Sequence, residues 1–408
     1  MKILFIHQNF PAQYRWLAQT LAGDKRWEVM ALGEAGNIKR RGKLPGVNTA
    51  GYAAPQPASQ QTHHYVKPLE GAVRRGQAVV RACLELKKRG FVPDLVYAHP
   101  GWGEALFLRD VYPDARITLY CEFYYRATGR DVGFDPEFPA NLDDIFRVRI
   151  KNAASILSLE AADAGISPTR WQRDAFPAEY RDRIALIHEG VDTTVVKPDA
   201  RVELALPKGP KLTARDEVVT YIARNLEPYR GFHILMRALP EILRRRPKAH
   251  VLVVGADGVS YGQSPPKGTT YRKKYLEEIG NGVDLSRVHF MGQVPYETLL
   301  NVYRVSSVHV YLTYPFVLSW SLLESMAAGC AVVASRTPPV EEVITDHKNG
   351  YLVDFFKPGE IAERVDELLE RPQDTTTVRE RARKTIVERY DLKTICLPKQ
   401  IELVNGRK

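Results

Sequence analysis

The sequence predicts an α/β protein of two domains, each built on a parallel sheet. Its 408 residues exceed what one hydrophobic core usually accommodates. Short runs of β-branched and aromatic residues alternate with segments of helical composition, which is typical of βαβ units. A stretch rich in Pro, Lys and Gly, residues 197–216, interrupts that alternation and indicates a hinge. We therefore expect domains over 1–196 and 217–390, with 391–408 as a closing helix that returns to the first domain.

Composition places the chain among globular proteins. Hydrophobic residues make up 44% of it and charged residues 26%. No run reaches the roughly 18 apolar residues of a membrane span, and polar residues directly follow the apolar start of the chain, so we expect a cytoplasmic protein. The four cysteines form no C-x-x-C pair, which indicates neither a zinc knuckle nor a disulfide framework.

The first domain opens with a buried strand at Lys2–Gln8 and a helix that begins at Pro11 and ends at Gly23. A second strand is expected at Glu28–Leu32. The polar stretch Gly36–Tyr65 shows no clear period and is expected as a long loop. We interpret it as a mobile flap over an acceptor, which limited proteolysis with and without acceptor would test.

This domain also carries an excess of positive charge. Between Lys39 and Arg89 there are eleven basic residues against two acidic ones, a surplus of nine, within a formal charge of +10 for the whole chain. Such a patch can attract an anionic membrane or a phosphorylated acceptor, or it can simply be a solvated face. No aromatic and basic repeat accompanies it, so nucleic acid is not expected as a partner.

Candidate polar residues follow the later strands of the first domain. A basic helix over 71–89 leads to a strand ending at His99, then to Pro100–Gly103 and a helical segment. The next strand, from Ile117, carries Glu122 and Tyr125 at its carboxyl end, a position that suits an acceptor. A helix near 142–153 and a strand at 155–160 are expected to follow.

The second domain begins with a strand at Glu217–Arg224 and a helix that starts at Phe232. A strand at His250–Gly258 precedes the polar insertion 257–273, whose purpose the sequence does not reveal. Further on, a short strand ends at Gly292, and a helix starts near Pro295. Helices are expected over 358–370 and 376–390.

The central unit of this domain runs from Val308 to Arg336. It reads as strand, tight loop, helix and strand, because VHVYLTY and AVVAS are strand-like while SLLESMAAG is rich in helix formers and ends in Gly. In open α/β sheets, ligands lie at the carboxyl edge, and a helix N-terminus there favours an anion such as phosphate. Backbone N–H groups would come from Ser319, Ser321 and Leu322. Glu324 lies one turn inside the helix, where a carboxylate can accept from two ribose hydroxyls, or can form an S-x-x-E capping box with Ser321.

The chain resembles the retaining, GT-B fold glycosyltransferases of family 4. Their second domain contains E-x7-E, which ends in a helix of the form LLEAMAxGxPVVAS. The matching residues in this sequence are Glu324, Ala327, Ala328, Gly329, Val332, Val333, Ala334 and Ser335. The position of the first glutamate holds Phe316 instead. The resemblance is strong over 217–356 and weaker before that, and it implies a GT-B fold of two Rossmann-like domains that face a cleft.

The resemblance also implies roles for individual residues. His99 matches the histidine that contacts the donor sugar near the reacting carbon. Arg224 and Arg230 stand near the positions of an Arg and a Lys that clamp the diphosphate, with one extra residue between them. Guanidinium groups bind phosphate oxygens with two hydrogen bonds and keep their charge. The family's Gly-Gly turn is replaced around Gln13, which we place at the acceptor.

The remaining donor contacts follow from the same comparison. The resemblance places Phe316 beside the transferred sugar and Glu324 on the ribose. It also points to main-chain atoms after the Gly of a short strand as contacts of the base edge. The residues expected to bind the donor are Glu324, Ser319, Trp320, Ser321, Leu322, Val294, Gln293 and Phe316.

The implied reaction moves a sugar from a nucleoside diphosphate sugar, as co-substrate, to a hydroxyl acceptor, with no other cofactor and no metal. Cleavage of the bond from the anomeric carbon to phosphate leaves negative charge on the diphosphate, which cationic side chains stabilise. Two rivals remain. One is another GT-B enzyme, an epimerase or a phosphorylase, which donor turnover alone or a phosphate requirement would reveal. The other is a non-catalytic nucleotide-sugar-binding protein.

Overall fold

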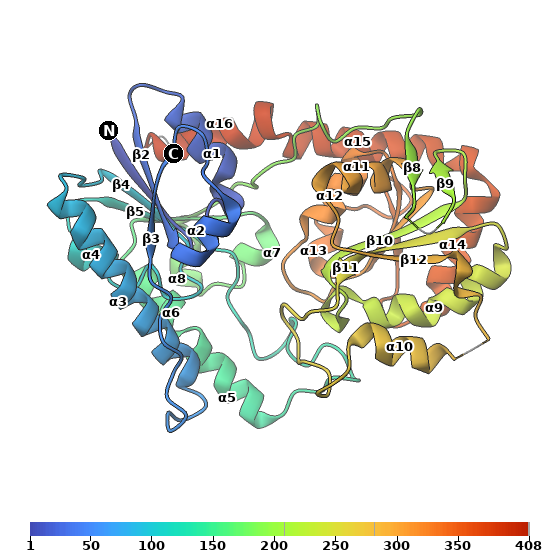
Figure 1. The fold of residues 1–408 in the computed structure, drawn as a ribbon, viewed down its shortest axis with the longest axis horizontal. Coiled ribbons are helices and arrows are strands. Elements are labelled where there is room, and N and C mark those ends of the chain that lie inside the picture. The colour runs from blue at the N-terminus through green and yellow to red at the C-terminus, as the bar shows by residue number, and fades with distance from the viewer. Residues whose placement is uncertain (208, 281, 407–408) are drawn as a thin grey trace. The chain divides into compact units, whose positions relative to one another are not determined.

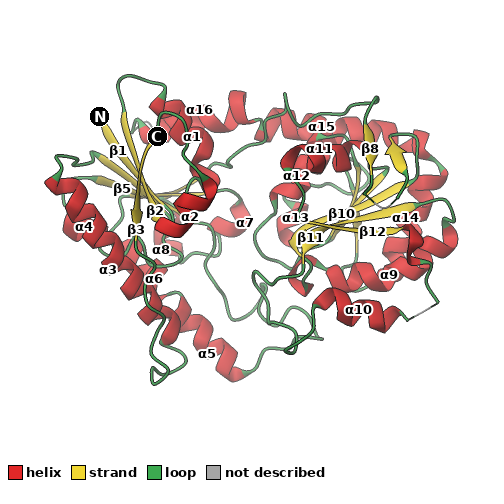
Figure 2. Cartoon of the chain, viewed as in Figure 1, coloured by secondary structure: helices red, strands yellow, loops and turns green. Residues whose placement is uncertain are grey.

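The computed structural model describes residues 1–207, 209–280 and 282–406. Their contacts divide them into two units. One contains residues 1–189 and the chain from Cys396 onwards, and the other contains Gly190–Ile395. Figure 1 follows the chain through both units, and Figure 2 shows that each consists of a sheet with helices on its two faces.

Within the described residues, the first unit contains a seven-stranded sheet in the order β3-β2-β1-β4-β5-β6-β7, with every neighbouring pair parallel. Its strands are β1 Lys2–Ile6, β2 Glu28–Glu34, β3 Asn48–Tyr52, β4 Leu95–Ala98, β5 Arg116–Tyr120, β6 Ala164–Ser167 and β7 Ile184–Leu186. Its helices are α1 Arg15–Ala22, α2 Ala35–Arg41, α3 Lys67–Lys88, α4 Leu108–Val111, α5 Leu142–Lys151, α6 Ala153–Glu160, α7 Arg170–Arg173, α8 Ala178–Arg181 and α16 Leu397–Val404.

The strand order of this sheet reverses between β1 and β4. The chain winds outward from β1 through β2 to β3, and then from β4 through β5, β6 and β7 on the other side. Ligands of open α/β sheets bind beside the carboxyl ends of the strands at such a reversal. The residues that follow β1 and β4 are His7 and His99.

The second unit contains a six-stranded parallel sheet in the order β12-β11-β10-β13-β14-β15 and a small antiparallel pair, counted over the described residues. The strands are β8 Glu203–Ala205, β9 Lys211–Thr213, β10 Val218–Asn225, β11 His250–Ala256, β12 Val288–Gly292, β13 Val308–Tyr311, β14 Ala331–Ser335 and β15 Tyr351–Val353. The helices are α9 Phe232–Arg245, α10 Tyr271–Ile279, α11 Tyr296–Val305, α12 Trp320–Ala327, α13 Pro338–Glu341, α14 Pro358–Glu370 and α15 Thr376–Tyr390.

The strand order of the second sheet reverses between β10 and β13, so its expected ligand site lies beside the ends of these two strands. The stretch 197–216, predicted as a hinge, contains the pair β8–β9. Its apolar side chains Val202, Leu204, Leu206 and Leu212 belong to the main core of the second unit.

In the first unit, α16 packs on α1, and its residues Leu397 and Ile401 contact the core beneath.

Two predicted elements of the first unit are wrong. The stretch 36–65 is not one long loop, because α2 and β3 lie within it and β3 pairs with β2 in parallel register. The segment 155–160, predicted as a strand, forms most of α6. A helix places Ala154 and Ser158, four residues apart, on the same buried side, and a short apolar run does not distinguish the two structures by its period.

Candidate functional site

The candidate site of the first unit is built on the two histidines at its strand reversal. The Gly101 N–H donates to Nδ1 of His99 (3.0 Å), and the Asn9 N–H donates to Nδ1 of His7 (2.8 Å). Because Nδ1 accepts in both rings, the neutral imidazoles carry their proton on Nε2. The ring centroids are 5.2 Å apart. Each ring is therefore held by the backbone turn after its own strand, with a donor left to face other groups.

Glu122, placed at the acceptor on its position alone, contacts His99. Nε2 of His99 lies 3.3 Å from Oε2 of Glu122, and the His99 ring stacks on Trp102 with 4.4 Å between centroids. His99 is buried, whereas Glu122 is half-buried. The two other acceptor candidates have different surroundings. Tyr125 donates its N–H to Asn152 and lies under Lys151, and Gln13 is half-buried in the short 3-10 turn before α1.

Two candidate residues of this site were missed from the sequence. Burial lowers the pKa of His7 well below its usual value, with smaller contributions from His99 and Arg41, so His7 stays neutral. Glu104 is buried and accepts from the Tyr52 hydroxyl (3.1 Å), while its Oε2 has no partner among the described residues. Burial raises the pKa of Glu104. For His7 the available signal was its place directly after a strand, whereas His99 was selected by its match to the family pattern.

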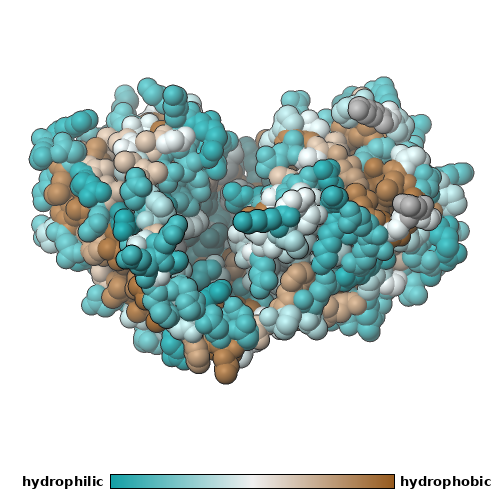
Figure 3. Space-filling view, turned by 60° about the horizontal axis from the view of Figure 1, so that its bottom comes forward, coloured by the Kyte–Doolittle hydropathy of each residue, from teal (hydrophilic) through white to brown (hydrophobic). Residues whose placement is uncertain are grey.

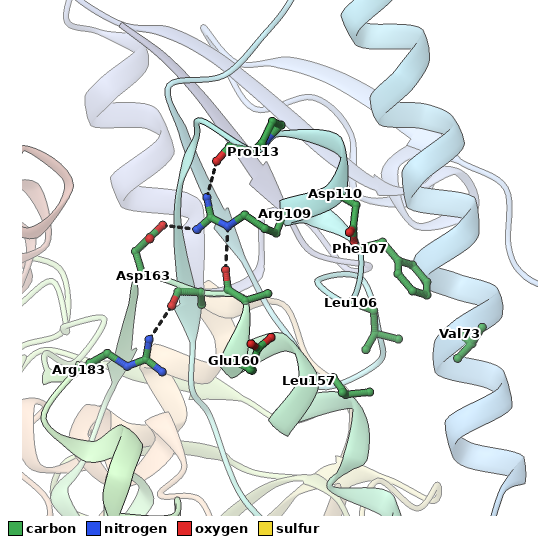
Figure 4. Close-up of a pocket in the computed structure, with 12 residues that line it drawn as sticks. Val73, Leu106, Phe107, Arg109, Asp110, Pro113, Leu157, Glu160, Asp163 and Arg183 are labelled. Carbon is green, nitrogen blue, oxygen red and sulfur yellow. Dashed lines mark hydrogen bonds and ion pairs between the residues drawn. The ribbon is translucent and has the colours of Figure 1, made fainter.

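A groove on another part of the first unit is lined partly by polar groups that bond to other parts of the fold. It is lined by residues of α3, α4 and α6, including Val73, Phe107 and Arg109, and contains none of the predicted site residues. The Arg109 guanidinium donates to the carbonyls of Ala161 and Pro113 and to the carboxylate of Asp163 (Figure 4), and it also donates to the carbonyl of Ala115. Because these acceptors occupy its N–H groups, Arg109 ties loops together and is a poor ligand anchor.

The candidate site of the second unit surrounds Arg230, which lies in the turn after β10. Its side chain is 7% exposed, and its guanidinium donates to Oγ1 of Thr313 (2.9 Å) and to the carbonyl of Val317 (3.0 Å). Both acceptors belong to the loop between β13 and α12, so Arg230 joins the ends of the two strands at the reversal. Burial alone would lower its pKa, but the Tyr311 and Tyr261 hydroxyls, with Glu227, raise it. The other predicted clamp residue, Arg224, is exposed at the end of β10.

Glu324 is held by two tyrosines. The hydroxyl of Tyr296 donates to Oε1 (2.9 Å) and that of Tyr303 to Oε2 (3.2 Å). Burial raises the pKa of Glu324, and the two hydroxyls oppose that shift. The capping-box alternative is wrong, because the N-cap of α12 is Ser319, whose Oγ accepts from the Ser321 N–H, and Glu324 turns to the tyrosines instead.

The other predicted donor residues lie around these two anchors. The N–H of Ser319 donates to the Tyr311 hydroxyl, and that of Leu322 to the Ser319 carbonyl. Trp320 is 49% exposed at the start of α12. After β12, Gln293 is exposed and Val294 packs against the core. Phe316 is buried among aromatic side chains beside Arg230. In the described part of the chain, no group of three or more His, Cys, Asp or Glu residues could hold a metal ion.

Sequence comparisons identify the class of protein that this fold and these sites define. Residues 25–196 match the model for the "Glycosyl transferase family 4 group", and residues 207–385 match that for "Glycosyl transferases group 1". The chain is thus a GT-B glycosyltransferase by family, as its resemblance predicted, and the predicted fold class is confirmed. No helix among the described residues is both long and apolar enough to cross a bilayer.

Among curated relatives, D-inositol 3-phosphate glycosyltransferase of Corynebacterium efficiens is 30% identical over 48% of this chain and 45% of its own length. Spore coat protein SA of Bacillus subtilis is 28% identical over 48% of this chain and 51% of its own. The matched region thus spans about half the length of these relatives.

Solved structures agree in fold over the whole chain. The Anabaena HepE structure with UDP-glucose has a TM-score of 0.66 at 17% identity, with 100% of this chain and 99% of that chain covered. Sucrose-phosphate synthase from Thermosynechococcus elongatus has a TM-score of 0.72 at 18% identity, with 100% and 98% covered.

Proposed function

We propose that this protein transfers a sugar from a nucleoside diphosphate sugar to a hydroxyl group of an acceptor. The observation that carries the proposal is the arrangement at the strand reversal of the second sheet. There a buried guanidinium, that of Arg230, is bonded to the loop that enters α12, and the carboxylate of Glu324 lies one turn into that helix. A cation and a helix N-terminus suit a diphosphate, and a carboxylate suits the neighbouring ribose diol.

The chemistry follows from where charge develops. As the bond between the anomeric carbon and phosphate breaks, negative charge grows on the diphosphate and positive charge on the sugar ring. A permanent cation beside the leaving group stabilises this state without a metal ion. We propose retention at the anomeric carbon, with the acceptor proton passing to the departing phosphate oxygen on the same face. Proton NMR of the fresh product would give the anomeric configuration.

The acceptor is proposed to bind the first unit at the histidine pair. Nε2–H of His99, the carboxylate of Glu122 and the unpartnered Oε2 of Glu104 suit hydroxyl groups, which both donate and accept hydrogen bonds. A sugar, a lipid-linked sugar or another polyol fits this description, and synthesis of a polysaccharide, glycolipid or other glycoconjugate would use such a transfer. The relatives named for D-inositol 3-phosphate support a polyol as the acceptor.

Peripheral contact of the first unit with an anionic membrane is part of the proposal. Exposed Arg81, Lys87 and Lys88 lie on α3 around the exposed Leu84, and α5 has no buried residue and exposes Leu142 and Phe146. On the first unit, at the left of Figure 3, apolar residues lie among hydrophilic ones. Sedimentation with phosphatidylglycerol vesicles should capture the protein, and phosphatidylcholine vesicles should not.

A thermal-shift screen against UDP, GDP, ADP and their sugars tests the nucleotide site, since a ligand raises stability with its concentration over its Kd. Donor turnover is then followed with glucose, inositol and inositol phosphate as trial acceptors. A transferase turns over donor faster with its acceptor present. An epimerase converts donor without an acceptor, and a phosphorylase needs inorganic phosphate. If the protein binds the nucleotide sugar but does not turn it over, not even by slow hydrolysis, it is a non-catalytic binding protein.

A further inference from the structure

The polar insertion after β11 is fixed to the end of β10 by one buried carboxylate. Glu227 is 0% exposed and accepts the N–H groups of Ser260 (3.0 Å), Tyr261 (3.1 Å) and Gly262 (3.3 Å). The Asn225 amide adds a bond to the Ser260 hydroxyl (2.6 Å). A buried carboxylate that receives three N–H groups holds its loop firmly, because any shift would leave a charge without partners.

The fixed segment lies close to the turn after β10. A Cβ at Gly262 would lie 3.1 Å from the Tyr229 ring, tighter than most real contacts, and 4.0 Å from Oε2 of Glu227. The backbone of the insertion therefore rests directly on the turn that carries Arg230. The side chain of Tyr261, the residue between Ser260 and Gly262, therefore lies over the candidate donor site.

Tyr261 lies against both Arg230 and Phe316. The Arg230 guanidinium carbon is 5.4 Å from the centre of the Tyr261 ring, and the rings of Tyr261 and Phe316 are 4.8 Å apart in an edge-to-face arrangement. The Tyr229 ring packs on Tyr314 at 4.6 Å. Phe316 is buried, whereas Tyr261 remains 38% exposed. The accessible group beside Arg230 is thus an aromatic ring supported by other rings.

The order of groups in the proposed donor decides what this ring would meet. In a nucleoside diphosphate sugar the diphosphate separates the ribose from the transferred sugar. If Glu324 holds the ribose and Arg230 the diphosphate, the sugar lies beyond Arg230. Tyr261 and Phe316 border Arg230 and present C–H and π surface, which suits the C–H face of a sugar.

We propose that Tyr261 is a specificity-determining residue for the sugar of the donor, which packs a C–H face of a hexosyl group on its ring, and that Glu227 is the positioning residue that holds it there. This inference rests on the proposed function. It assigns the 257–273 insertion to recognition of the hexose and not of the nucleotide. If this contact is as strong as one between two aromatic rings, it contributes up to about tenfold in affinity.

The test compares each nucleotide with and without its sugar. Calorimetry gives Kd for UDP against UDP-glucose and for GDP against GDP-mannose, in the wild type, Tyr261→Ala, Tyr261→Phe and Glu227→Gln. Ser264→Ala is the matched control, since it is exposed on the same insertion. We expect Tyr261→Ala to weaken the better nucleotide sugar about tenfold while Kd of the bare nucleotide stays within about twofold. Tyr261→Phe should keep most of the affinity.

Glu227→Gln separates positioning from a merely structural role. A glutamine offers one acceptor oxygen and an NH₂ group that cannot accept the remaining N–H groups, so the segment should be released. The same sugar-selective loss as in Tyr261→Ala is expected, together with faster hydrogen exchange in 258–264. A lower Tm without a sugar-selective loss would overturn the positioning role. Equal Kd ratios in the wild type and Tyr261→Ala would overturn the specificity role, and failure of the wild type to bind any of these nucleotides would overturn the proposed function itself.

Discussion

The two candidate sites use the same position in a parallel sheet and are built in opposite ways. In the second unit, the bonds of Arg230 join the turn after β10 to the loop after β13, and both carboxylate oxygens of Glu324 accept from tyrosine hydroxyls of α11. In the first unit, each histidine accepts an N–H from its own turn, His99 also contacts the half-buried Glu122, and Glu104 keeps one carboxylate oxygen without a partner among the described residues.

The difference suggests a division of work. A site that receives the same nucleotide diphosphate in every cycle gains from groups already held in place, because the ordering free energy is not spent on binding. A site with unpaired polar atoms is completed by its ligand, since unpaired buried groups are unfavourable until a partner arrives. We therefore expect the second unit to tolerate little change at Arg230, and the first unit to show its losses only when acceptor and catalysis are measured.

The largest effect is expected for Arg230→Ala. It removes the cation beside the leaving group, so turnover should fall by a factor on the order of 10² or more. Arg230→Lys, which keeps the charge but not the two hydrogen bonds, should recover part of the rate. Steady-state kinetics with circular dichroism as a folding check would measure this, and EDTA should have no effect on the wild type. Full activity in the alanine variant, or loss of activity with chelator, contradicts the mechanism.

A smaller and more selective loss is expected for His99→Ala. If the first unit acts on the reacting groups and not on the nucleotide, kcat should fall roughly 10-fold to 10²-fold while Kd for a nucleoside diphosphate stays within about twofold. Glu122→Gln keeps a hydrogen-bond acceptor for Nε2 and serves as the matched variant, with a milder loss expected. An equal loss of nucleotide affinity in His99→Ala would erase the contrast between the two sites.

The same contrast explains what the sequence could predict. The second-unit site rests on local order: a strand, a loop and a helix within 29 residues, 308–336, with helix formers and a closing glycine. The expected helices at 358–370 and 376–390 are confirmed as α14 and α15. The position of Glu324 on its helix followed from the chain alone. Its tyrosine partners lie 28 and 21 residues earlier, and no local pattern brings them to it.

The parts that could not be predicted depend on contacts between distant segments. The sequence does not single out Glu227, because its partners come from the insertion more than 30 residues later. The sequence alone does not bring His7 and Glu104 together with His99, because that depends on the pairing of β1 with β4. The stretch 36–65 lacks an apolar period because β3 is an edge strand of small and polar residues, NTAGY, whose place is fixed by pairing to β2.

Glu324→Gln should weaken nucleotide binding about tenfold, since hydrogen bonds to a charged acceptor contribute about 1.5–3 kcal/mol. The effect should be smaller for a 2′-deoxynucleoside diphosphate, which leaves the carboxylate only the 3′-hydroxyl to accept from. Because burial raises the pKa of Glu324, the carboxylate takes up its proton at a higher pH than an ordinary glutamate. The ratio of wild-type to variant affinity should thus fall toward one as pH is lowered through that raised pKa.

The ionised carboxylate of Glu324 is expected to favour nucleotide binding but to lower the stability of the fold. A raised pKa means that the folded chain binds the proton more tightly than the unfolded chain, so the ionised carboxylate destabilises the fold above that pKa. Glu324→Gln should therefore be no less stable than the wild type at neutral pH, although it binds nucleotide more weakly. Calorimetry over pH with parallel thermal unfolding checks both statements. A variant that loses stability together with affinity would instead indicate a structural carboxylate.

The smallest effects are expected at two helix N-caps, one in each unit. Ser319 caps α12 and Asn141 caps α5, each accepting a backbone N–H. Replacement by alanine should destabilise either helix by about 1 kcal/mol, visible as faster hydrogen exchange in its peptides. Ser319→Asp separates capping from ligand binding. An aspartate caps well and favours a helix N-terminus, so stability should be retained, but its charge would repel a diphosphate. Nucleotide affinity should then fall in Ser319→Asp and stay unchanged in Asn141→Asp, and equal affinities in the two would show that α12 does not receive the diphosphate.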